Sequence, residues 1–218
     1  MVATKKMQNK ITAAAKDVLL APVYLYQGHK IKRDTVRLPE PNGERHGQVQ
    51  LNNSPITSKG KSNNILNLMV VGDSAAAGVG SQTQQEALVG HLIPILTEQA
   101  AIQSAFDTLN WSLQATTGYT SFDILRRLYV LPAPSQPIDV MVLSVGVNDT
   151  TSKVSAAQWQ QQIENIIAIA QRKFGVRELV FLSLPPMAQM PAIPAPLNNF
   201  VGAKAAILDN SLQQICAA

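Results

Sequence analysis

Short apolar runs alternate with longer amphipathic stretches beyond residue 64. Four runs are mostly apolar and bounded by Gly, Pro or polar residues, as buried strands are: 65–71, 105–113, 138–145 and 178–184. Four longer stretches have the mixed pattern of helices: 75–96, 121–129, 156–174 and 197–215. The alternation predicts βαβ units, and therefore a parallel sheet covered by helices on both faces.

Composition divides the chain into three parts. Residues 1–38 form a basic arm with one short apolar run. Residues 39–64 are rich in Pro, Asn and Gly and have hardly any apolar periodicity, which predicts a linker that is poorly ordered or loosely packed. Residues 65–218 are long enough for one domain with a full core.

The positive charge is concentrated near the N-terminus. Residues 1–61 carry eleven Lys/Arg and four Asp/Glu, a net +7, whereas residues 62–218 carry seven and ten, a net −3. The apolar run 18–26 is shorter than the roughly 20 residues that span a bilayer. The small residues 13–15 precede this run, whereas a signal-peptide cleavage site would follow it. We expect a cytoplasmic or membrane-peripheral chain, whose arm is either solvated or lies on the domain or a membrane surface.

Other classes of function find little support in the composition. Cys216 is the single cysteine, which rules out an intramolecular disulfide and a cysteine metal cluster. No nucleic-acid motif accompanies the basic residues, and we expect no nucleic-acid partner. We expect neither a cofactor nor a metal.

Three polar or glycine-containing motifs each follow a predicted strand. Gly72-Asp73-Ser74 comes after the first strand, where the serine is either exposed at the sheet edge or serves as a helix cap. Gly118 follows the second strand, as a backbone N–H donor or a plain turn glycine. Asn148, in Gly-Val-Asn-Asp after the third strand, is either a side-chain donor or part of an Asx turn. Together they converge on one edge of one sheet.

These motifs resemble those of the SGNH/GDSL serine ester hydrolases over roughly residues 65–215. Residues 72–74 resemble the first conserved block, Gly118 the second, and residues 146–149 the third. Residues 20–39 resemble the leader of a bacterial branch of these proteins. The resemblance implies a flavodoxin-like three-layer α/β/α sandwich and Ser74 as nucleophile. It also implies an oxyanion hole made by the backbone N–H groups of Ser74 and Gly118 and the side chain of Asn148.

The catalytic histidine and aspartate of the family were not found. Family members end on a further strand and a D-x-x-H motif, and these 218 residues contain no D-x-x-H. The histidines are His29 and His46 near the N-terminus and His91 in the first predicted helix after Ser74. His91 is expected on a helix surface, running away from the serine. We expect a chain shortened at its C-terminus, without the last strand of the fold.

Three functions follow from these patterns. The first is hydrolysis of acyl esters, with thioesters and acetylated sugars as further substrate classes, through an acyl-enzyme on Ser74. The second is a non-catalytic binding domain that keeps the oxyanion pocket but lacks the histidine. The third is a phosphate-binding flavodoxin-like domain, which is disfavoured because the first βα turn has neither a Walker nor a dinucleotide pattern.

Overall fold

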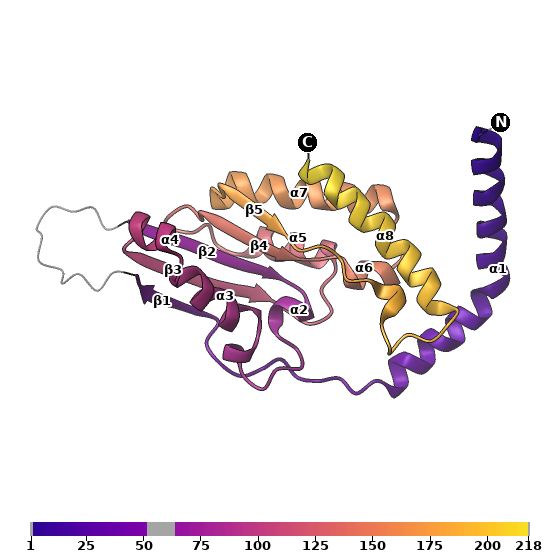
Figure 1. Cartoon of the computed structure of the whole chain (residues 1–218), viewed down its shortest axis with the longest axis horizontal. Helices are drawn as coiled ribbons and strands as arrows, with labels where there is room; N and C mark the ends of the chain where they lie inside the picture. The colour runs from indigo at the N-terminus through magenta and orange to yellow at the C-terminus, as the bar shows by residue number, and fades with distance from the viewer. Residues whose placement is uncertain (1, 52–63, 218) are drawn as a thin grey trace, which may run out of the picture.

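A five-stranded, mostly parallel sheet forms the centre of the molecule (Figure 1). The computed structural model describes residues 2–51 and 64–217. The strands lie in the order β1-β3-β2-β4-β5, with β1 antiparallel to β3 and the other pairs parallel. Their bounds are His46–Gln50 (β1), Ile65–Gly72 (β2), Thr108–Ala115 (β3), Val140–Ser144 (β4) and Glu178–Phe181 (β5). The predicted α/β fold is confirmed.

The helices cover both faces of this sheet. Those of the first half are α1 (Val2–Asp34), α2 (Ser74–Ala77), α3 (Leu88–Thr97), α4 (Ala100–Ala105) and α5 (Ser121–Val130). Those of the second half are α6 (Val147–Thr151), α7 (Ala156–Phe174) and α8 (Leu197–Cys216), with short 3-10 turns at Gln84–Glu86 and Met187–Gln189. Among the described residues, no helix qualifies as a membrane span.

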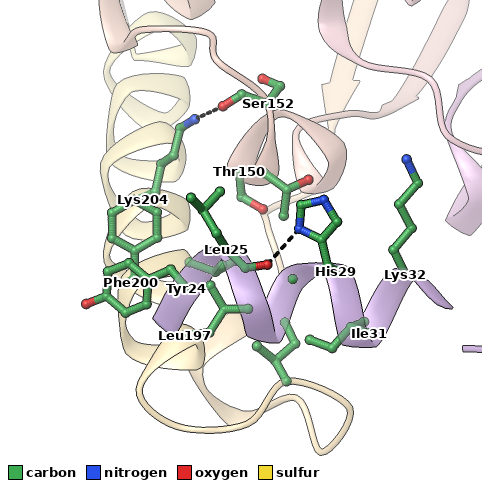
Figure 2. A pocket seen from close by; sticks show the side chains of 14 residues that line it. Tyr24, Leu25, His29, Ile31, Lys32, Thr150, Ser152, Leu197, Phe200 and Lys204 are labelled. Atoms are coloured by element: carbon green, nitrogen blue, oxygen red, sulfur yellow. Dashed lines mark hydrogen bonds between the residues drawn. The ribbon is translucent and has the colours of Figure 1, made fainter. Parts of the chain in front are cut away.

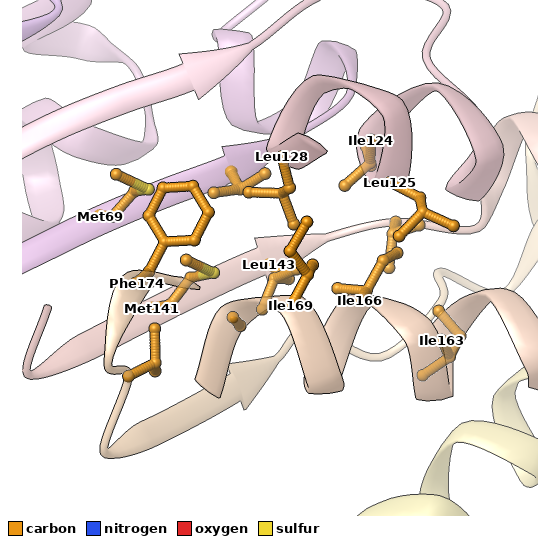
Figure 3. Close-up of a cluster of buried hydrophobic side chains, with 14 of the residues drawn as sticks. Met69, Ile124, Leu125, Leu128, Met141, Leu143, Ile163, Ile166, Ile169 and Phe174 are labelled. Carbon is orange, nitrogen blue, oxygen red and sulfur yellow. The ribbon is translucent and has the colours of Figure 1, made fainter. Parts of the chain in front are cut away.

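Two apolar clusters lie on opposite faces of the sheet because side chains alternate along each strand. On β2, Met69 and Val71 face the cluster that α5, α7 and α8 cover (Figure 3). Leu68 and Val70 of the same strand face the other cluster, under α2 and α3. The molecule therefore has the three layers that the sequence predicts.

Helix ends follow the local sequence closely. Thr120 caps α5, and the Asp123 carboxylate accepts from the Thr120 backbone N–H at 3.0 Å, a capping box. Ser155 and Gln158 form the same arrangement at the start of α7. Gly175 ends α7 with φ +64°, a left-handed conformation that glycine adopts at little cost. The predicted helix 156–174 is confirmed at both ends.

Several elements differ from the prediction. Residues 46–50, placed in a loosely packed linker, form the edge strand β1 against β3, and residues 52–63 of that linker lie outside the described part. The single helix predicted over 75–96 is broken, because Gly78 adopts a left-handed conformation, with φ +84°, after the four residues of α2. In the arm, α1 spans 33 residues and far exceeds the short predicted helix.

Candidate active site

Ser74, Gly118 and Asn148 follow the carboxyl ends of three adjacent parallel strands. Ser74 begins α2 after β2, Gly118 lies in the turn after β3, and Asn148 lies on α6 after β4. β2 lies between β3 and β4 in the sheet. The chain continues from β2 towards β3 on one side and from β4 towards β5 on the other side, so the strand order reverses between β2 and β4. Open α/β sheets bind ligands at such a switch point. The topology therefore brings the three motifs to one edge of the sheet, while their catalytic roles remain predictions.

The capping role considered for Ser74 belongs to its neighbour. Asp73 is the N-cap of α2, and its Oδ1 accepts from the Ala75 backbone N–H at 3.1 Å and from Ser144 Oγ at 3.0 Å. Within the described part of the chain, neither the Ser74 hydroxyl nor its backbone N–H makes a hydrogen bond. The side chain is half-buried at the start of a helix. At the sheet edge the Ser74 hydroxyl and N–H are therefore free of structural hydrogen bonds, while its carbonyl oxygen accepts from the Gly78 and Val79 N–H groups at 3.0 and 3.1 Å.

Gly118 lies in an exposed turn that needs a glycine for its backbone conformation. Its φ is +85°, which L side chains rarely adopt, although a Cβ there would meet no atom within 4 Å. Its backbone N–H has no acceptor among the described residues. An unpaired N–H at this edge is what an oxyanion donor requires.

Asn148 ties its helix to this turn. Its Nδ2 donates to the Tyr119 carbonyl oxygen at 2.8 Å, which uses one of two amide hydrogens and leaves the other for a ligand. The N-cap residue of this helix is Gly146, whose φ is +120°. A Cβ at Gly146 would lie 2.9 Å from both Leu184 Cδ1 and Trp159 Cη2. The turn into Asn148 therefore requires glycine for two independent reasons.

A buried carboxylate fixes α6 against α5. Asp149 Oδ2 accepts from the Ser121 backbone N–H at 3.0 Å, and its Oδ1 accepts from Ser121 Oγ at 2.7 Å. Burial raises the pKa of Asp149, an effect that the Ser121 hydrogen bonds and the charge of Lys204 only partly offset. Burial also lowers the pKa of Lys204, whose Nζ donates to the Ser152 carbonyl oxygen at 2.6 Å. These contacts position the helix that carries Asn148.

Glu40 holds the turn before Gly118 from a distant part of the chain. Its Oε1 accepts from the Thr117 backbone N–H at 2.7 Å and from Thr117 Oγ1 at 2.9 Å, while Oε2 accepts from Arg45 Nη1 at 2.8 Å. Burial acts to raise the pKa of Glu40, but the hydrogen bonds from Thr117 and Arg45 outweigh it, and the net pKa lies below its usual value. Sequence reasoning missed Glu40, because it lies 77 residues away within the predicted linker.

The three histidines lie on other elements. His91 is exposed on α3, where the sequence predicted a helix-surface residue, and His46 is exposed on the edge strand β1. His29 lies on α1, where its Nδ1 is 2.8 Å from the Leu25 carbonyl oxygen. Among the described residues none of these rings hydrogen-bonds to Ser74. No three His, Cys, Asp or Glu side chains of the described part are grouped as a metal site would require.

A cavity of about 690 Å³ lies between α1, α6 and α8 (Figure 2). The apolar residues Leu25, Leu197 and Phe200 line it, and so do the basic residues Lys32 and Lys204. Neither Ser74, Gly118 nor Asn148 lines it. The volume is that of a small-molecule site, but the cavity is distinct from the edge that carries the predicted nucleophile.

Asp73 makes the stability of the fold depend on pH. Burial raises its pKa above the ordinary 3.8, against the hydrogen bonds from Ala75 and Ser144, and its Oδ2 has no partner in the described part of the chain. A raised folded pKa means that the contribution of this carboxyl to stability is fully present below its ordinary pKa and is lost as pH rises through the folded value. We expect the free energy of unfolding of Asp73→Asn to fall less between about pH 4 and pH 7 than that of the parent. Denaturant titrations at both pH values measure this, and an equal fall in the two proteins contradicts the assignment.

Comparison with known proteins gives a family match and structural neighbours. The GDSL-like lipase/acylhydrolase family matches residues 70–218, whereas no curated protein sequence matches the chain. A lipolytic G-D-S-L family protein from Veillonella parvula is 15% identical, with a TM-score of 0.52 over 70% of this chain and 73% of that one. LAE5, an alpha/beta hydrolase from the metagenome of Lake Arreo, is 15% identical, with a TM-score of 0.51 over 72% and 73%. Those two structures share the fold, and the family match covers most of the chain. The chain therefore belongs to the GDSL-like lipase/acylhydrolase family.

Proposed function

We propose that the chain is a serine hydrolase of carboxylic esters with Ser74 as its nucleophile. The observation that carries the proposal is the convergence of Ser74, Gly118 and Asn148 at the ends of β2, β3 and β4 in a chain of this family. Acyl esters are the substrate class, with thioesters and acetylated sugars as further candidates. In support, solved structures that the fold resembles include a lipolytic protein and a hydrolase.

The proposed reaction has two steps. Ser74 Oγ attacks the ester carbonyl carbon, the alcohol leaves with a proton, and an acyl-enzyme remains that water then hydrolyses to the acid. The oxyanion that forms in each step accepts hydrogen bonds from the Ser74 and Gly118 N–H groups and the free amide hydrogen of Asn148. These groups are preorganised, because Asn148 is bonded to Tyr119 and the Gly118 turn is bonded to Glu40.

The proton of Ser74 requires a base that the family supplies from D-x-x-H. These 218 residues contain no such motif. A second candidate is a binding domain that retains the oxyanion pocket without turnover. A serine hydrolase without its triad still accelerates hydrolysis about 10³-fold over water through its oxyanion hole and binding. Both candidates keep this pocket, so only turnover that depends on Ser74 separates them.

The test is p-nitrophenyl acetate hydrolysis by the 218-residue chain and its Ser74→Ala variant. We expect slow turnover above the buffer rate, and Ser74→Ala should lose the part of it that proceeds through the acyl-enzyme while it keeps the part that the oxyanion pocket alone supplies. A rate that is identical in both proteins supports the binding domain.

Glu40 is a positioning residue in this scheme. Glu40→Gln weakens the charge-assisted hydrogen bonds to Thr117 and Arg45, so the Gly118 N–H loses its fixed direction. We expect about a tenfold lower Ser74-dependent kcat with little change in KM, because misplacement of a transition-state donor affects the reaction rather than binding. Glu44→Gln, an exposed neighbour, is the matched control and should keep the parent rate. Equal rates in all three proteins would remove Glu40 from the mechanism.

A further inference from the structure

The helix α1 presents an apolar face that the rest of the described chain leaves uncovered. Five large apolar side chains within nine residues are exposed, and we call them the apolar face of α1: Val18 (75%), Leu19 (79%), Val23 (39%), Leu25 (64%) and Tyr26 (69%). Elsewhere exposed apolar side chains are spread over several elements. A concentrated patch of this kind marks an interaction surface.

The opposite side of α1 is held by the domain. The Tyr24 ring stacks on Phe200 of α8 with centroids 4.8 Å apart. Gln27 Nε2 donates to the Ala195 carbonyl oxygen at 2.7 Å, and Gln27 Oε1 accepts from the Leu197 N–H at 3.2 Å. Figure 1 shows the second half of α1 beside the start of α8, while its first half extends away from the sheet. These contacts fix the orientation in which the apolar face points outward.

The charge around this face is positive. Residues 1–38 contain eight Lys/Arg and two Asp. Both acids are already engaged, since Asp17 accepts from the Tyr24 hydroxyl at 3.1 Å and Asp34 pairs with Arg33 at 2.7 Å. Lys16 precedes the apolar face, and Lys30 and Lys32 follow it. An apolar face flanked by lysines is complementary to the headgroups and acyl chains of an anionic bilayer surface.

We infer that α1 docks this protein peripherally on membranes that contain anionic lipid, with its apolar face in the interfacial layer. A second copy of the chain is the less favourable occupant, because a symmetric interface would place the same basic residues against each other. Leu25 and Lys32 also line the cavity between α1, α6 and α8, so docking brings the side of this cavity to the bilayer. The inference stands independently of the proposed hydrolase activity.

The test is co-sedimentation of the whole chain with phosphatidylcholine vesicles and with vesicles that also contain phosphatidylglycerol. We expect binding to the second kind only, weakened at high salt, because a Debye length of about 10 Å at 0.1 M shrinks to about 3 Å at 1 M. Leu19→Ser should weaken the partition coefficient about tenfold, because it removes most of one buried aliphatic side chain. Lys30→Gln should weaken it about fivefold.

Val130→Ser is the matched control, since Val130 is 76% exposed on α5, outside the apolar face. It should bind like the parent, and the thermal melts of all variants should coincide because each site is exposed. Absence of vesicle binding, or equal binding of Leu19→Ser and Val130→Ser, overturns the inference. So does self-association of the parent, seen by light scattering, that Leu19→Ser abolishes, because the face would then be an interface between copies.

Discussion

A chain extended beyond residue 218 by a strand and a D-x-x-H segment is expected to hydrolyse p-nitrophenyl acetate about 10⁴ to 10⁶ times faster than the 218-residue chain. The reason is chemical. Ser74 is a neutral hydroxyl with no hydrogen-bonded base among the described residues, and its attack on an ester requires an imidazole to take its proton. The aspartate of the added motif would hold that imidazole in the correct tautomer and orientation.

Three proteins make this comparison quantitative. The extended chain should reach ordinary esterase rates, about 1 to 10³ s⁻¹. The same extension carrying Ser74→Ala should lose that rate, and an extension with its histidine replaced by alanine should match the 218-residue chain. If the 218-residue chain itself turns over at ordinary esterase rates in a Ser74-dependent manner, then another base serves Ser74. Replacing His91 on α3 is the first step in finding it.

Trp159→Ala is expected to lower the free energy of unfolding by about 3 to 5 kcal/mol. Trp159 lies on α7 with none of its surface exposed, in the cluster shared with β2, β4 and α5. Its Nε1 has no hydrogen-bond partner in the described part of the chain, so the ring stabilises the fold by packing alone. Truncation removes those contacts and leaves a cavity.

Trp159→Ala should also disturb the candidate site, because Trp159 Cη2 packs against Gly146, the residue before α6. Tyr129→Ala is the matched control, since this ring is 61% exposed and its removal should change stability by about 0.5 kcal/mol or less. Denaturant titration measures both variants. A loss below about 1 kcal/mol for Trp159→Ala would mean that the surrounding side chains collapse into the space.

Elements with strong local signals could be predicted from the sequence. Helix 156–174 carries its cap, its apolar periodicity and its terminal glycine in one stretch, and the structure reproduces its bounds. The strand β1 could not be predicted, because Val49 is its only strongly apolar residue and its stability comes from pairing with β3. The five-residue helix α6 was also missed, because a single turn leaves no periodicity to read.

In the candidate site, too, some residues could be predicted from the sequence and others could not. The order of the motifs around Ser74, Gly118 and Asn148 predicts their common sheet edge, since each follows an apolar run. The residues that hold them in place carry no such local signal. Glu40 bonds to Thr117 from a segment read as linker, and Ser121 meets Asp149 across 28 residues. Contacts of this kind arise only from the tertiary fold.

If Ser74 is a nucleophile that a triad base can activate, a serine-directed phosphonate should label it covalently. The extended chain carrying D-x-x-H is incubated with the probe, followed by intact mass measurement and peptide mapping. We expect a single adduct on the peptide that contains Ser74, and no adduct in the Ser74→Ala protein. An extended chain that folds but stays unlabelled, or carries its adduct on a different serine, contradicts it.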